Sequence, residues 1–190
     1  MRPIAAGCLA TAMTLASMGL AAGYPGTTRD RPPPAHTGAF GEPSCTECHN
    51  DYDANHGDGE LLLTGLPDAW KPGHSYDLIL EVRDAGMRAA GFQLSARFDD
   101  GSPAGLLVPG PDEAGRVDVD TSTTVPYAHH LYDGTNLRAP GSGRWVIRWT
   151  APVEGTGAVA LNAAVVTADN DLSPLGDLVY TARWTVPPRP

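Results

Sequence analysis

The chain has 190 residues, and 13 Lys and Arg stand against 22 Asp and Glu, so its formal net charge is -9. This acidic balance disfavours nucleic acid as a partner, because binding phosphates requires a cationic face. Gly and Pro are abundant, with 22 and 18 residues, whereas only 18% of residues are charged. Many turn-forming residues, few helix-favouring residues and abundant Val and Thr predict an all-β domain.

Residues 1–23 have the features of a secretory signal peptide. Arg2 precedes an apolar stretch of small residues from Ile4 to Leu20, and Ala21-Ala22-Gly23 fits cleavage after small residues. A transmembrane anchor is the alternative, but an apolar span of about 17 residues falls short of the roughly 20 that a spanning helix needs. We therefore expect an exported protein, periplasmic or extracellular, with no membrane span once the signal is removed.

The rest of the chain divides into three segments. Residues 24–44 form an extended lead rich in Pro and Gly, and residues 45–60 hold a cysteine pair and an acidic loop. From 61 to 187, apolar and polar residues alternate in short runs, which predicts strands with one buried and one solvated face. The clearest runs are 76–82, 92–98, 145–149, 159–165 and 178–186, and weaker ones lie near 61–66, 104–108, 116–120 and 124–131. About nine short strands predict an antiparallel β-sandwich.

The sequence Cys45-Thr46-Glu47-Cys48-His49 has the spacing of a c-type haem attachment site. Two thiols at this spacing can add to the two vinyl groups of one haem, and the adjacent His49 then serves as the proximal iron ligand. The alternatives are a disulfide loop, a redox dithiol and half of a zinc site. The third cysteine, Cys8, leaves with the signal peptide, so no further thiolate completes a zinc site, and no βαβ context supports a redox dithiol. We expect one covalently attached haem c.

Further short sequences stand before and after this motif in a characteristic order. They are Thr37–Glu42, Trp70–Gly73 with Tyr76, Gly91–Leu94, Tyr127–His130, Trp145–Pro152, Gly155–Gly157, and Gly176-Asp177 with Tyr180. This ordered set, from about residue 37 to 186, resembles the secreted bacterial Reeler-like domains often labelled choice-of-anchor V. The resemblance implies a Reeler-like β-sandwich with a haem-bearing N-terminal segment packed on it. Phe40 stands where this family usually has Pro.

Six side chains are candidates for the distal position on iron: His36, His56, His74, His129, His130 and Met87. In the resembling family a histidine follows a Tyr-containing segment, and aligning Tyr127 and Gly134 places His130 at that position. Strand alternation turns His129 and His130 to opposite faces, so one regular strand cannot direct both at one iron. We expect His130 as the distal ligand and His129 as the next candidate. Ligation by Met87 would raise the potential relative to two imidazoles.

Together these features predict an exported monohaem c-type cytochrome that passes single electrons between partners. We expect an electron carrier rather than an enzyme, because no catalytic constellation stands out, and redox partners with a basic docking patch. Two alternatives stay open, since sandwiches host many functions. One is a haem enzyme or a gas or redox sensor with an open distal position. The other is an adhesion or carbohydrate-binding sandwich in which haem is a structural staple.

Overall fold

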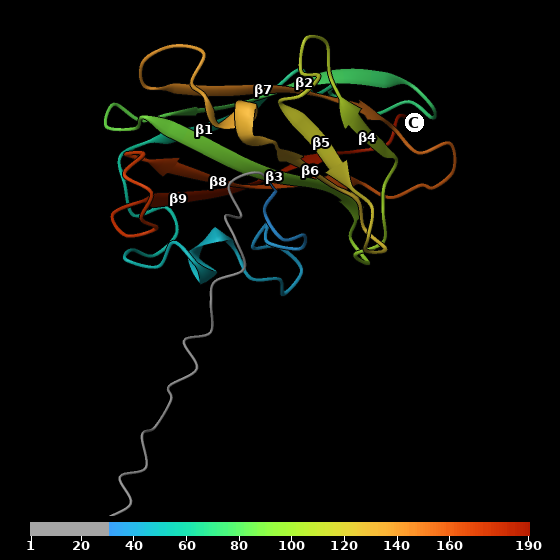
Figure 1. The fold of residues 1–190 in the computed structure, drawn as a ribbon. Helices are drawn as coiled ribbons and strands as arrows, with labels where there is room; N and C mark the ends of the chain where they lie inside the picture. The colour runs from blue at the N-terminus through green and yellow to red at the C-terminus, as the bar shows by residue number, and fades with distance from the viewer. Residues whose placement is uncertain (1–30) are drawn as a thin grey trace, which may run out of the picture.

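The structure is a computed structural model that describes residues 31–190. The expected signal peptide, residues 1–23, and the first part of the lead lie outside the described residues. Two antiparallel sheets stack face to face in the described part of the chain (Figure 1). None of its helices is long and apolar enough to cross a membrane.

The described residues form nine strands. The sheet with the order β1-β2-β7-β4 consists of β1 (Glu60–Thr64), β2 (Ser75–Arg83), β7 (Ser142–Thr150) and β4 (Leu106–Pro109). The sheet with the order β5-β6-β3-β8-β9 consists of β5 (Val117–Asp120), β6 (Tyr127–His130), β3 (Ala89–Phe98), β8 (Val159–Ala168) and β9 (Leu178–Val186). The predicted antiparallel β-sandwich is therefore confirmed.

The hydrophobic core lies between the two sheets. Trp145 of β7 packs against Phe92 of β3 with ring centroids 4.6 Å apart, so the two sheets meet through aromatic side chains. The indole N–H groups of Trp145 and Trp149 donate to the carbonyls of Gly134 at 2.8 Å and Ala104 at 2.9 Å. Because these polar atoms have partners, the large tryptophan rings can be buried without an unpaired donor.

The expectation of one solvated face per strand is wrong for β3 and β8. Every residue of β3 from Ala89 to Arg97 is buried, because residues 31–49 lie across the outer face of the five-stranded sheet (Figure 1). Gln93 points to this covering segment. Its amide donates to the carbonyl of Pro33 at 2.9 Å and accepts the backbone N–H of His36 at 2.7 Å. The outer face of the sheet is thus a polar docking surface for the lead.

A buried charge pair anchors the lead to the same face. The carboxylate of Glu42 accepts hydrogen bonds from Arg97 of β3 and from the hydroxyl of Tyr127 of β6. Desolvation lowers the pKa of Arg97 and raises the pKa of Tyr127. The guanidinium carbons of Arg97 and Arg183 lie over the ring of Phe40, 4.9 Å and 5.3 Å from its centroid. Its φ of 55° excludes Pro, whose φ is fixed near -65°, from this position.

Candidate haem site

The short helical turn η1 (Cys45–Glu47) begins at the first cysteine, and Cys48 and His49 follow directly after it. The hydroxyl of Ser44 caps the turn by accepting the backbone N–H of Thr46 at 3.3 Å. The backbone N–H of His49 donates to the carbonyl of Cys45 at 3.0 Å, which continues the turn as far as His49. Both cysteines are free thiols rather than a disulfide. The local backbone therefore holds the three groups of the motif together.

Cys45, Cys48 and His49 line a cavity of about 350 Å³, a volume in the range of small-molecule sites. The opposite wall comes from the outer face of the five-stranded sheet, where the side chains are small. These wall residues are Ala89 and Gly91 of β3 and Val166 and Ala168 of β8. A loop between β8 and β9, including Leu172 and Pro174, forms part of the rim. The cavity is therefore mostly apolar and lies between the attachment turn and the sheet.

His130 lines the same cavity and is only 8% exposed. It reaches the cavity because β6 ends there. The antiparallel pairing of β6 with β3 ends at the residue pair His129 and Gln93. At His130 the side chain takes the place of a backbone partner, so its Nδ1 lies 2.9 Å from the amide nitrogen and 3.2 Å from the carbonyl oxygen of Phe92. The two polar groups of Phe92 thus fix the orientation of the ring.

Gly91 makes room for this ring. A Cβ atom built on Gly91 would lie 2.5 Å from Cε1, 2.9 Å from Nδ1 and 3.0 Å from Nε2 of His130. The ring therefore rests against a position of β3 that only glycine leaves open. Two tautomers of His130 are compatible with Phe92. In one, Nδ1 accepts the amide N–H; in the other, Nδ1–H donates to the carbonyl and Nε2 carries no proton.

His129, the next distal candidate, occupies a different place. It lies beside Gln93 on the outer face of the sheet, fully buried, and is not among the described residues that line the cavity. Its Nδ1 is 2.8 Å from the carbonyl oxygen of His130, and within residues 31–190 its Nε2 has no hydrogen-bond partner. Strand alternation therefore separates the two histidines as expected, and the end of β6 directs His130 to the cavity.

The remaining candidates are also accounted for. His36 lines the cavity, but its Nδ1 is 2.9 Å from the carbonyl of Pro34 and its Nε2 is 2.6 Å from the carboxylate of Glu47. Met87 is buried in the core between the sheets. His74 lies in an exposed turn, with Nδ1 3.3 Å from the carbonyl of Pro72.

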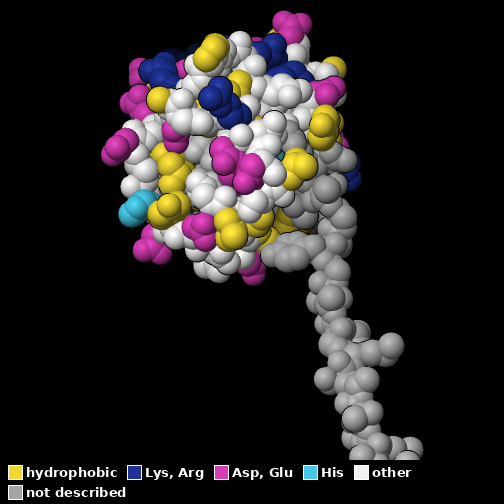
Figure 2. Space-filling model, turned by 60° about the vertical axis from the view of Figure 1, so that its left-hand side comes forward, with side chains coloured by type: hydrophobic (Ala, Val, Ile, Leu, Met, Phe, Trp, Pro, Cys, Tyr) yellow, Lys and Arg dark blue, Asp and Glu magenta, His cyan; other side chains and the backbone are white. Residues whose placement is uncertain are grey.

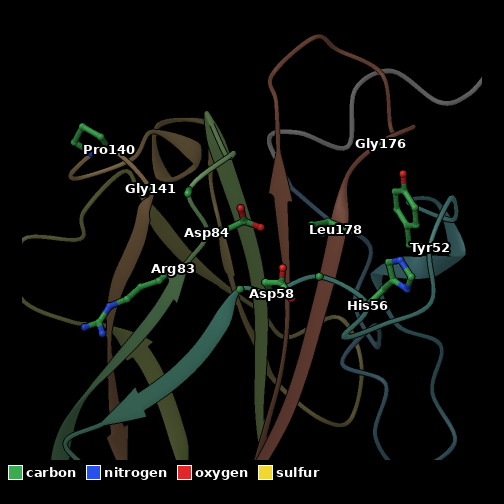
Figure 3. A pocket seen from close by; sticks show the side chains of 12 residues that line it. Tyr52, His56, Asp58, Arg83, Asp84, Pro140, Gly141, Gly176 and Leu178 are labelled. Atoms are coloured by element: carbon green, nitrogen blue, oxygen red, sulfur yellow. The ribbon is translucent and has the colours of Figure 1, made fainter.

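His56 lines a second and larger hollow, of about 880 Å³. Figure 3 shows His56 beside Tyr52 on one side of this hollow and Arg83 on the other side. The two rings stack with centroids 5.0 Å apart and an interplanar angle of 11°. This hollow is larger than the first, but the cysteine pair and His130 line only the smaller cavity. We therefore place the candidate site in the smaller cavity.

Asp177 is a residue of the cavity to which the sequence analysis assigned no role. It directly precedes β9, and its Oδ2 lies 2.7 Å from Nδ1 of His49. The carboxylate side chain is 3% exposed, whereas His49 is 29% exposed. Because Nδ1–H of a neutral His49 donates to this carboxylate, the lone pair of His49 is on Nε2. Asp177 appeared in the sequence only as half of a short Gly-Asp match, which said nothing of its contact with His49.

The thiol of Cys45 is not poised for redox exchange or for binding a bare metal ion. Burial raises its pKa from 9.0 to about 12, and the nearby Cys48 adds to this effect. The reactive form of cysteine is the thiolate, so a redox dithiol or zinc ligand needs a lowered pKa instead. In the described part of the chain, no group of three or more His, Cys, Asp and Glu side chains could hold a metal ion.

Comparison with known proteins identifies the fold. No known family profile matches the sequence, and no curated protein matches it. The Reelin-N domain of F-spondin superposes with a TM-score of 0.51 and 22% identity over 73% of this chain and 91% of that chain. The human F-spondin reeler domain gives 0.50 and 20% identity over 72% and 93%. The protein therefore has a Reeler-like β-sandwich fold.

Proposed function

We propose that the protein is an exported monohaem c-type cytochrome that carries single electrons. In this proposal Cys45 and Cys48 hold one haem c through thioether bonds, His49 is the proximal ligand and His130 is the distal ligand. The observation that carries the proposal is that the attachment motif and a histidine from a distant strand line one cavity. When bound, the haem supplies a one-electron Fe(III)/Fe(II) couple.

The chain's own residues fit such a group. The small side chains along β3 and β8 leave space for a flat ring against the sheet. Each of the two histidines has a partner for Nδ1, Asp177 for His49 and Phe92 for His130, and a histidine that binds a metal through one ring nitrogen commonly donates the other N–H to such a partner. The apolar wall and the covering lead would limit the access of water to a bound haem. If His49 and His130 both held the iron, electron transfer would be favoured over the binding of a further ligand.

The acidic residues near the cavity rim would favour a redox partner that is basic. Around the cavity rim, Leu172 is 84% exposed, and the same loop carries the exposed Asp169 and Asp171. Figure 2 shows acidic side chains interspersed among hydrophobic ones over the lower part of one face, with Lys and Arg gathered towards the top. A redox partner with a cationic patch would be steered to such a rim, and the steering would weaken as salt screens the charges.

Visible spectroscopy of protein made in a haem-c-competent host tests the distal assignment. We expect the wild type to be low spin in both oxidation states and not to bind carbon monoxide. His130→Ala should open the iron, so that the reduced protein becomes high spin and binds carbon monoxide. His129→Ala is the matched control, because that neighbouring histidine is also buried but is not among the described residues that line the cavity, and it should remain low spin. A low-spin His130→Ala protein that excludes carbon monoxide would contradict the distal role of His130.

A second candidate is a binding module in which haem staples the lead to the sheet. The contacts of Gln93 and Arg97 with the lead favour it, because an iron bridge between His49 and His130 would join the same two parts. In this case the iron would not exchange electrons at a useful rate. Stopped-flow reduction by a cationic and by an anionic ruthenium or iron complex separates the two candidates. An electron carrier should react faster with the cationic complex, and added salt should slow that reaction.

A further inference from the structure

Asp177 is a buried carboxylate whose only ion-pair partner among residues 31–190 is His49. Its Oδ2 is 2.7 Å from Nδ1 of His49, and its Oδ1 has no hydrogen-bond partner in the described part of the chain. An ionised carboxylate that is 3% exposed is unfavourable unless positive charge compensates it. The contact with Nδ1 of His49 is the hydrogen bond that the described residues give to this side chain.

The fold holds Asp177 in this position. The preceding Gly176 has a φ of +85°, a conformation that favours glycine, and its N–H donates to the carboxylate of Asp51 at 2.8 Å. Asp51 lies two residues after His49 in the attachment segment. On the other side of Asp177, the backbone enters β9 at Leu178. The carboxylate is thus fixed between the start of a strand and a contact to the segment that carries its histidine.

We propose that Asp177 is a positioning residue for the proximal histidine and lowers the reduction potential of the site. This inference rests on the proposed function. By accepting Nδ1–H, Asp177 selects the tautomer of His49 in which the Nε2 lone pair is available to iron. Its negative charge also makes the imidazole a stronger donor. The extra positive charge of Fe(III) relative to Fe(II) is therefore stabilised, which shifts the couple towards the oxidised form.

The tautomer is tested in protein without haem. Nitrogen-15 NMR of the His49 ring, assigned by comparison with His49→Gln, should show the proton on Nδ1 in the wild type. In Asp177→Ala the carboxylate is gone, so the proton should be found largely on Nε2. Asp171→Asn, which removes an exposed carboxylate from the same loop, should leave the His49 signals unchanged. A wild-type His49 with its proton on Nε2 would overturn the positioning role, even if the Asp177 variants fail to fold.

The potential is tested in the haem-loaded protein by redox titration. Asp177→Asn keeps the shape and an acceptor oxygen but removes the charge. At a fixed applied potential this substitution should lower the ratio of ferric to ferrous protein at least tenfold. A tenfold change corresponds to a rise of about 59 mV in the reduction potential of a one-electron couple. Asp171→Asn should produce a clearly smaller shift. Equal shifts in the two variants, or none in Asp177→Asn, would overturn the inference.

The two proposals fail in different ways. If mass spectrometry finds no haem on Cys45 and Cys48, the proposed function fails, whereas the NMR experiment still decides the contact between Asp177 and His49. If haem is attached and the Asp177→Asn potential equals that of the wild type, the electron carrier stands and the role of Asp177 is wrong.

Discussion

Replacing Gly91 by alanine should displace His130 from its place against β3. The new Cβ would lie 2.5 Å from Cε1 and 2.9 Å from Nδ1 of the ring, well inside van der Waals contact. The nearest atoms belong to a ring that Phe92 holds through Nδ1, so the ring cannot move without losing a hydrogen bond. The clash depends entirely on His130. The free-energy cost of this clash can therefore be measured by comparing Gly91→Ala in proteins with and without the imidazole.

The magnitude follows from two opposing effects. In a strand interior, Gly→Ala alone stabilises by about 0.5–1 kcal/mol, because alanine loses less backbone freedom on folding. Overpacking against the His130 ring costs about 1–3 kcal/mol. Gly91→Ala should thus destabilise the wild type by up to about 2.5 kcal/mol, whereas in His130→Ala it should be neutral or stabilising. We expect a coupling energy of about 1–3 kcal/mol between the two positions.

Urea unfolding of the haem-free protein measures this coupling with four variants: wild type, each single substitution and the pair. A parallel cycle of Gly91→Ala with His129→Ala is the control, and its two effects should add to within about 0.5 kcal/mol. Midpoints are comparable only if the urea dependence of the unfolding free energy is unchanged. If Gly91→Ala has the same effect with and without His130, the ring does not rest on Gly91 and the placement of His130 is wrong.

Three further changes test the contacts around the site. In Cys48→Ala without haem, the alkylation rate of Cys45 should still rise with pH at pH 10, because a pKa of about 12 keeps the thiol protonated there. For a thiol with a pKa of 9.0 the rate would be levelling off at that pH, and a plateau near pH 9 would contradict the prediction. Glu42→Gln should lower the unfolding free energy by about 3 kcal/mol, since Arg97 loses its buried partner; an unchanged urea midpoint would count against the anchor. Phe40→Pro should loosen the lead, seen as faster limited proteolysis there, because Pro cannot adopt a φ of 55°; unchanged cleavage would refute the local geometry.

Much of the fold could be predicted because alternation is a local signal. Rows such as 145–149 and 159–165 lie within β7 and β8, and even the weak segment near 124–131 contains β6. The second buried face could not be predicted in the same way. Gln93 and Arg97 are polar, which by pattern alone indicates solvent, and only the packing of the lead turns them into buried contacts.

The candidate site was predictable to the extent that its residues form a motif or part of the resemblance. Cys45 to His49 is one contiguous motif, and His130 followed from the order of matched segments. Asp177 and Gly91 gave no comparable signal, because their roles depend on contacts between segments far apart in the sequence. Glycine in a strand and aspartate before a strand are common, so neither residue type indicates a site until the fold brings it to His130 or His49.

Covalent attachment of haem is the central claim, and denaturing mass spectrometry of protein made in a haem-c-competent host tests it most directly. We predict a mature chain that carries the mass of one haem and keeps it after unfolding. The variant with both Cys45→Ala and Cys48→Ala should lose that mass, whereas His130→Ala should keep it because His130 binds only the iron. A wild-type chain with no added haem and with both thiols free or joined in a disulfide would contradict the claim.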